Sequence, residues 1–412
     1  MTSSFGVKGL DELTAVTLHA LRLGAGKRNG PLPRGGPEEL RGVVLRDLGA
    51  VLPEVGTTEA EAVGALTALT AAGSADPADP ACAGHLHCPP LAVAVVADLA
   101  VSALNQSVDS WDQGPAATWI ELAVLRELAA LAGFPPDTAA GTESNLMGLL
   151  LAQESARGGQ HVVLCSEQAH FSVWRACSTL GIGDGAVIAA GTDGDHRMSV
   201  PALRTALHEA TAGGRQPVAI VATAGTTDLG AIDPLPEIAE LAREHGVWLH
   251  VDASYGGGAL FSQRHGRKLD GLARADSVAL DLHKLGWLPV PAGVFLAADR
   301  RSFGSLEREV AYLNLADDVA RTIAAHSDLL LRAEPALTTV VLRYAPAGFA
   351  DLNELNARLR RDLLQSGRAV VGRTEFDGVV WLKLTLLKPR TTEAEVEQLL
   401  DLVVSTGAQV RP

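Results

Sequence analysis

One lysine lies within a largely apolar segment and could act as a nucleophile. Lys284 stands in the strand-like run ADSVALDLHKLGWLPVPAGVFL. Burial disfavours the charged form of an amine, so it lowers the lysine pKa and leaves the amine able to attack a carbonyl carbon. The segment therefore favours Schiff-base chemistry at Lys284. Considered by itself, however, a lysine at a strand end more often extends its amine to solvent.

Three other motifs carry groups suited to a bound ligand. Asp252 follows the apolar run VWLHV, and the carboxyl ends of parallel strands are where open α/β sheets bind ligands. Gly141 and Thr142 precede a helix whose free N–H groups and dipole would favour an anion. His170 follows a strand and opens a helix. Each motif has an ordinary alternative, since Asp252 and Thr142 could cap helices and a lone histidine is usually structural.

Taken together, the four motifs describe a site for pyridoxal phosphate. The lysine would bind the cofactor aldehyde, and the turn before the helix would bind its phosphate. The strand-end carboxylate would pair with the ring nitrogen, and the histidine would stack on the ring. The order and spacing of the motifs, rather than any one of them, carry this interpretation.

The elements that must position these residues alternate along the chain. Short apolar strands such as HVVLCS, VAIVATAG and SVALDL are separated by helical stretches up to about residue 300. This alternation predicts an α/β fold with a mainly parallel sheet covered on both faces. The pattern after about residue 300 predicts a smaller α+β domain. Its expected elements are helices over 315–334 and 351–365, a strand pair in VVGRTEFDGVVWLKLTLL and a final helix from Thr392.

Composition excludes several classes of protein. The chain has 412 residues, of which 47% are hydrophobic and 20% charged, so it is not a disordered chain. Its net charge of −14 argues against a nucleic-acid binder, and four cysteines do not form a disulfide scaffold. The first residues lack the basic start and apolar run of a signal peptide, so we expect none, and the apolar run over 91–104 is too short to span a bilayer. We expect this run to be a buried helix in a soluble, cytoplasmic protein that binds no membrane.

The same segments resemble the pyridoxal-phosphate-dependent group II amino-acid decarboxylases, which have the aspartate-aminotransferase fold, fold type I. The segments TAGTTDLGAIDPLPEIAELAREHGVWLHVDASYGGGAL and ADSVALDLHKLGW are highly specific to that family. The resemblance runs from about Gly84 to Leu313. HLHCPP (residues 85–90) and NQSVDSWDQGPAAT (105–118) are similar to the diaminobutyrate-decarboxylase branch.

The resemblance implies a domain organisation and an assembly. We expect a homodimer with shared active sites, because such enzymes build their site at the subunit interface. The implied parts are an N-terminal helical dimerisation segment over 1–85, a large pyridoxal-phosphate-binding domain over 86–300 with a seven-stranded, mainly parallel sheet, and a small α+β domain over 301–412.

The resemblance also implies roles for individual residues. Lys284 would form the Schiff base, Asp252 would keep the pyridine nitrogen protonated, and His170 would stack on the ring. Tyr312 falls at the position of the catalytic-loop tyrosine and would act as general acid. The remaining implied contacts are Gly141, Thr142 and His283 at the phosphate, Thr227 and Ser254 near the ring, and His87, Cys88 and Asp109 at the substrate side chain.

The implied reaction is α-decarboxylation of an amino acid through an external aldimine and a quinonoid. After Tyr312 the chain omits a block of several helical turns that the family has, including part of the loop that closes the site. A less closed site admits water or oxygen. We therefore keep two alternatives open, which are aldehyde formation with oxidative deamination and β-elimination of an S-substituted cysteine in a natural-product pathway.

Three other interpretations fit less well. Cys82, His85, His87 and Cys88 lack the spacing of a standard zinc site, so we expect no metal. The segment GIGDGA lies after a helix and before a strand, which is the reverse of a dinucleotide fingerprint. A degenerate, non-enzymatic homologue with a structural role would not need the lysine, aspartate, histidine and tyrosine together.

Overall fold

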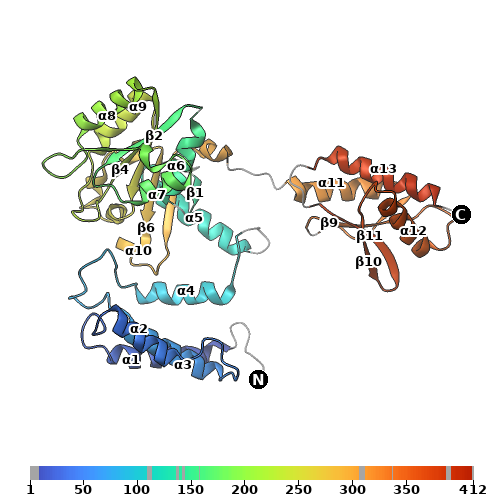
Figure 1. The fold of residues 1–412 in the computed structure, drawn as a ribbon, viewed down its shortest axis with the longest axis horizontal. Helices are drawn as coiled ribbons and strands as arrows, with labels where there is room; N and C mark the ends of the chain where they lie inside the picture. Colours follow the sequence, from blue (N-terminus) through green and yellow to red (C-terminus); the bar gives the residue numbers. More distant parts are fainter. Residues whose placement is uncertain are drawn as a thin grey trace. The chain divides into compact units, whose positions relative to one another are not determined.

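The chain divides into two compact units, Met1–Ser305 and Leu306–Pro412. The computed structural model describes residues 9–108, 114–135, 139–141, 144–156, 158–305, 311–335, 337–386 and 391–410. Figure 1 shows the ribbon of each unit.

The first unit is built on a seven-stranded sheet with the order β1-β7-β6-β5-β4-β2-β3. Strands β3, β2, β4, β5 and β6 are parallel neighbours, while β7 is antiparallel to both β6 and β1. The predicted α/β class and mainly parallel sheet are therefore confirmed. The strands are β1 (Ala139–Gly141), β2 (Gln160–Ser166), β3 (Val187–Ala190), β4 (Arg215–Thr223), β5 (Trp248–Ala253), β6 (Ser277–Asp281) and β7 (Gly293–Ala297).

Helices cover both faces of this sheet because successive strand residues point to opposite sides. In β4, Ile220 and Ala222 belong to one apolar core, together with side chains of α8 and α9. Ala219 and Val221 belong to the other core, with side chains of α6 and α7. The helices are α5 (Pro115–Leu131), α6 (Ser144–Ser155), α7 (Ser172–Thr179), α8 (Val200–Ala212), α9 (Leu235–His245) and α10 (Leu282–Leu285), with 3₁₀ turns at Asp184–Ala186, Gly256–Phe261, Gly266–Leu269, Leu272–Arg274 and Arg300–Ser305.

Among the residues described before α5, four segments are helical. Helix α1 packs closely against α3, where a Cβ on Gly24 would lie 2.4 Å from the carbonyl oxygen of Ala68. The bounds are α1 (Leu10–Gly26), α2 (Pro37–Leu48), α3 (Glu59–Gly73) and α4 (Ala92–Leu104).

Helix α4 corrects one expectation. Its segment is helical, as predicted, but the prediction that it is buried is wrong for the single chain, because none of its residues is buried. Val93 is 73% exposed and Val96 is 65% exposed. Apolar composition shows that a helix needs a covering surface, but it does not show whether the same chain supplies that surface.

In its described residues, the second unit is a four-stranded antiparallel sheet with three helices. Its core gathers side chains from both layers, including Leu342, Leu359 and Leu400. The expected helix over 315–334 is wrong at its end: it ends at Ala325, and part of the remainder forms a strand, because a short apolar run suits either structure. The elements are α11 (Ala311–Ala325), β8 (Leu329–Leu331), β9 (Thr339–Tyr344), α12 (Leu352–Gln365), β10 (Gly372–Phe376), β11 (Val379–Thr385) and α13 (Glu393–Gln409), and the sheet order is β10-β11-β9-β8.

Candidate active site

Three parallel strands of the first unit end in polar residues at one edge of the sheet. Thr223 ends β4, Asp252 lies near the end of β5, and Asp281 ends β6. Thr223 is paired in register with Asp252 on the adjacent strand. All three line a cavity of about 1070 Å³. The sheet therefore gathers polar groups from separate parts of the sequence at the carboxyl ends of its strands.

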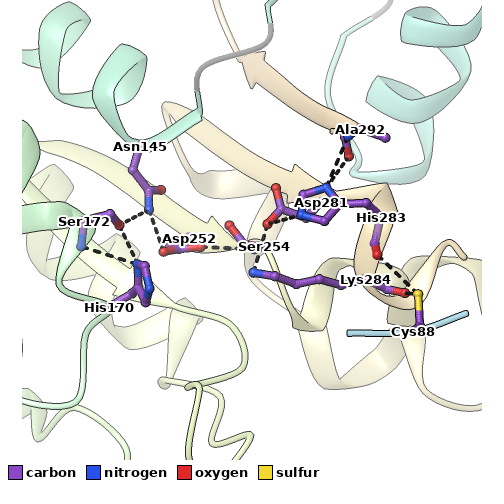
Figure 2. Close-up of polar contacts among 10 residues, drawn as sticks. All are labelled: Cys88, Asn145, His170, Ser172, Asp252, Ser254, Asp281, His283, Lys284 and Ala292. Carbon is purple, nitrogen blue, oxygen red and sulfur yellow. Dashed lines mark hydrogen bonds and ion pairs between the residues drawn. The ribbon is translucent and has the colours of Figure 1, made fainter. Parts of the chain in front are cut away.

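The Asp252 carboxylate is held at both oxygens. It is only 5% exposed. The backbone N–H of Ser254 donates to Oδ1 at 3.1 Å, and the side-chain amide of Asn145, on α6, donates to Oδ2 at 2.7 Å. Figure 2 shows Asn145 reaching the carboxylate beside Ser172. These contacts fix the direction of a negative charge that faces the cavity.

His170 is linked to the same cluster. The hydroxyl of Ser172 lies 2.8 Å from Nδ1 of His170, and the backbone N–H of Ser172 donates to that nitrogen at 3.3 Å. Asn145 Nδ2 also donates to the Ser172 oxygen, at 2.9 Å. The imidazole therefore lines the cavity with one nitrogen already engaged.

Lys284 lies on the short helix α10, beside an acid. Its amine is 2.9 Å from Oδ2 of Asp281, and Nε2 of His283 is 3.7 Å from the same oxygen. The other ring nitrogen of His283 is held by the backbone of Ala292, whose carbonyl oxygen lies 3.1 Å away. In Figure 2 the lysine side chain extends toward Asp281. The amine is thus directed into the cavity and has a counter-ion.

The segment before α4 contacts the lysine turn. The thiol of Cys88 donates to the carbonyl oxygens of Lys284, at 2.8 Å, and His283, at 3.2 Å. His87 is exposed and is not among the residues that line the cavity, whereas His85 and Leu86 are. Spacing alone could not distinguish these neighbours, because an irregular segment has no period that sets which side chain points inward.

The structure brings most of the predicted residues together. His170, Thr227, Asp252, Ser254, His283 and Lys284 line one cavity. Gly141 ends the edge strand β1. Thr142 and Asp109 lie outside the described residues. Tyr312 lies in α11, in the second unit, and its side chain is not among those described.

Sequence reasoning missed four residues of the cluster, which are Thr223, Asn145, Ser172 and Asp281. Asp281 carries a signal in hindsight, because it stands three residues before Lys284, the spacing of neighbours on a helix. Ser172 stands only two residues after His170, but no pattern in the sequence marks its hydroxyl as a partner of that ring. Asn145 meets Asp252 across 107 positions and Thr223 meets it across a strand pair, so no local pattern marks these two.

The metal interpretation finds no structural support. Within the described ranges, no group of three or more His, Cys, Asp or Glu side chains is arranged to hold a metal ion. Nor does any helix there combine the length and apolar composition required to cross a membrane.

The fold and this site define a pyridoxal-phosphate enzyme of fold type I. A family model described as the pyridoxal-dependent decarboxylase conserved domain matches residues 69–329. The chain belongs to this family, so it is a carboxy-lyase acting on an amino acid. These findings favour decarboxylation over the two alternative reactions.

Relatives and solved structures agree with the family. The chain is 39% identical to an L-2,4-diaminobutyrate decarboxylase of Rhizobium meliloti, over 87% of this chain and 84% of the relative. It is 30% identical to one of Acinetobacter baumannii, over 79% and 80%. A crystal structure of the glutamate decarboxylase domain of a Vibrio parahaemolyticus diaminobutyrate-pyruvate transaminase and L-2,4-diaminobutyrate decarboxylase is 31% identical, with a TM-score of 0.69, and covers 100% of this chain and 98% of that one.

The residues at the site fit pyridoxal phosphate. The cavity offers an amine for the aldehyde, a carboxylate for the ring nitrogen and an imidazole beside them. In addition, the buried Oγ1 of Thr223, which lines the cavity, has no hydrogen-bond partner within the described part of the chain. A buried hydroxyl without a partner is costly, and a polar atom of a bound ligand would satisfy it.

Proposed function

We propose that this enzyme decarboxylates L-2,4-diaminobutyrate, or a closely similar amino acid with a cationic side chain. The observation that carries the proposal is the 39% identity to a diaminobutyrate decarboxylase over most of both chains. The cavity adds chemical support, because Asp228 lines it and could pair with a side-chain ammonium. An aromatic side chain would gain nothing from a carboxylate there.

Each polar group of the cavity has a proposed task. Pyridoxal phosphate, when bound, accepts the electron pair released as the bond between Cα and the carboxylate breaks. Lys284 would hold the cofactor aldehyde, and its amine lies 2.9 Å from Oδ2 of Asp281. Asp252 would keep the ring nitrogen protonated. The remaining proposed contacts are His170, Thr227 and Ser254 at the ring, Gly141, Thr142 and His283 at the phosphate, and Cys88 and Asp109 toward the substrate; His87, which does not line the cavity, is not among them.

Tyr312 is the proposed general acid. As carbon dioxide leaves, Cα must gain a proton to give the amine, and a phenol hydroxyl can supply one. Tyr312→Phe should still release carbon dioxide but form less amine and more aldehyde, with dioxygen as the two-electron oxidant and with ammonia and hydrogen peroxide released alongside. Quantifying carbon dioxide and amine together tests this role, because an unchanged ratio of the two products would exclude it.

A substrate panel tests the proposed function. The cofactor-loaded enzyme would be incubated with diaminobutyrate and with basic, acidic, aromatic and S-substituted cysteine substrates, with Lys284→Ala as the inactive control. We expect carbon dioxide and 1,3-diaminopropane from diaminobutyrate at the highest kcat/KM. Preference for another amino acid would exclude the proposed substrate, and turnover by Lys284→Ala would exclude the proposed role of the lysine.

We also infer that the enzyme is a homodimer, held in part by residues 1–85 and by α4. Helix α4 exposes Val93, Val96 and Val101, and α5 exposes Trp119 and Ile120, all above 60%. Exposed apolar surface of this extent is typical of a protein interface. A second copy of the chain fits it because the family builds its sites between subunits.

The proposed compartment is the cytoplasm. The cysteines of the chain, Cys82, Cys88, Cys165 and Cys177, are all free thiols. Free thiols persist in a reducing compartment. A natural-product pathway remains the proposed context, and fractionation of the producing cell would test the compartment.

A further inference from the structure

A chain of hydrogen bonds links Trp248 to the active site, and its direction follows from the members that can only donate or only accept. Nε1 of Trp248 can only donate, and it lies 2.8 Å from Oγ of Ser277. The Ser277 hydroxyl hydrogen is therefore available for Nδ1 of His250, which is 2.8 Å away. The tautomer is set at the other ring nitrogen: Nε2 of His250 faces Oδ1 of Asn145, which can only accept, so His250 carries its proton on Nε2 and accepts at Nδ1. Nε2 lies 2.9 Å from Oδ1 of Asn145, to which it donates.

The direction continues into the active site. With Oδ1 of Asn145 accepting from His250, its Nδ2 group offers two N–H donors. One reaches Asp252 Oδ2 at 2.7 Å, and the other reaches Ser172 Oγ at 2.9 Å. The Ser172 hydroxyl, having accepted there, donates to Nδ1 of His170. The carboxylate end agrees independently, because Asp252 also accepts from the backbone N–H of Ser254.

The tautomer of His170 follows from the same chain. The backbone N–H of Ser172 is a second donor to Nδ1 of His170, at 3.3 Å. Because Nδ1 accepts, the proton of the neutral ring lies on Nε2. Nε2–H is then left to donate within the cavity that His170 lines.

A glycine makes room for this arrangement. Gly148 lies on α6, one turn beyond Asn145, and a Cβ placed on it would be 2.4 Å from Nδ1 of His250. The imidazole is fully buried, with no exposed surface. Helix α6 therefore contributes both the amide that receives the bond and the space that His250 occupies.

We propose that Asn145 is a positioning residue, which aims the Asp252 carboxylate at the ring nitrogen of pyridoxal phosphate and holds His170 in its Nε2–H form. This inference rests on the proposed pairing of Asp252 with that nitrogen. Asn145 acts through Asp252 and Ser172, so its loss should change how the protein responds to the ring nitrogen, and not only how stable the protein is.

The test compares two cofactors that differ at one atom. Pyridoxal phosphate and 1-deazapyridoxal phosphate, in which carbon replaces the ring nitrogen, are each titrated into the cofactor-free protein, and both Kd values are measured by absorbance. We expect the wild type to prefer pyridoxal phosphate about ten-fold or more, as for a hydrogen bond to a charged group. In Asn145→Ala the preference should fall to about three-fold or less.

The outcomes separate this inference from the proposed function. If the wild type shows no preference, the pairing of Asp252 with the ring nitrogen is wrong. If the wild type shows the preference and Asn145→Ala weakens both cofactors equally, Asn145 has only a structural role and the inference is overturned. Asn356→Ala is the matched control, because Asn356 is also a buried asparagine with several hydrogen bonds, but lies in the second unit, and its preference should equal that of the wild type.

Three further variants keep the test decisive if Asn145→Ala does not fold. His250→Gln retains a side-chain N–H donor near the position of Nε2, whereas His250→Leu has none. We expect the glutamine variant to retain more of the preference than the leucine variant. Gly148→Ala should also reduce the preference without removing any polar group. If the wild type, His250→Leu and Gly148→Ala prefer pyridoxal phosphate over its deaza analogue equally, the proposed hydrogen-bond chain is overturned.

Discussion

His250 shows how burial controls the charge of one residue beside the active site. Its ring is completely buried between Ser277 and Asn145. Burial lowers its pKa from an ordinary value of 6.5 to about 4, although the neighbouring Asp252 carboxylate opposes the change. A neutral ring is what the hydrogen-bond chain requires, because a doubly protonated ring could not accept from Ser277.

This lowered pKa predicts how stability depends on pH. The unfolded chain binds a proton at His250 below about pH 6.5, and the folded chain only below about pH 4. Above pH 6.5, His250 therefore does not reduce the free energy of unfolding. As the pH falls from 6.5 toward 4, that free energy decreases by about 1.4 kcal/mol for each pH unit. Urea unfolding between these pH values should show a smaller loss of unfolding free energy in His250→Gln than in the wild type. Parallel curves would contradict the assignment.

At the scale of elements, close approach fixes how a helix packs on its sheet. In the second unit, Gly407 on α13 faces the buried ring of Tyr344 on β9, and a Cβ on Gly407 would lie 2.4 Å from ring atoms. Asn356 on α12 holds both the N–H and the carbonyl group of Tyr344. Helix α13 and strand β9 therefore approach so closely at Gly407 that an added side-chain carbon would not fit.

This contact predicts opposite effects for two glycine substitutions. Gly407→Ala should lower the free energy of unfolding by about 1–3 kcal/mol, because overpacking displaces the tyrosine ring. Gly42→Ala, on α2, places its Cβ in open space and should be neutral or stabilise by up to about 1 kcal/mol, because alanine favours helix. Chemical denaturation of both variants measures the difference. Equal effects would show that the tyrosine ring moves aside without cost.

For the whole molecule, the apolar surface of α4 has the largest consequence. The single chain buries none of this helix, yet its composition is that of a core element. The proposed dimer would cover it, since two copies can bury the same face against each other. The proposed homodimer would therefore account for a helix that is too apolar for solvent.

The dimer predicts a sharp effect of one charge on α4. Val96→Asp should shift the protein toward monomer, because an unpaired carboxylate in a buried interface is costly. Light scattering and sedimentation at several protein concentrations would measure the shift. Val370→Asp is the control, since Val370 is 83% exposed in the second unit and should leave the assembly unchanged. A fully dimeric Val96→Asp protein would place the interface elsewhere.

The sequence by itself determined the fold class and indicated the residues whose types suggest the chemistry. Short apolar runs separated by helical stretches specify strands buried on both faces. Lys284, Asp252 and His170 follow such runs, and the order and spacing of these motifs together indicate them as candidate site residues. The start of the final helix also depends on neighbouring residues alone, because the side chain of Thr392 accepts a hydrogen bond from the backbone N–H of Glu395, three residues later.

Only the tertiary structure decided which groups surround those residues. Asn145 meets Asp252 across 107 positions, and Cys88 meets Lys284 across 196, because sheet order and helix packing place them together. His85 rather than His87 lines the cavity for the same reason. Contacts between distant segments depend on register and on the packing of whole elements, and these are set by the complete core and not by any local pattern.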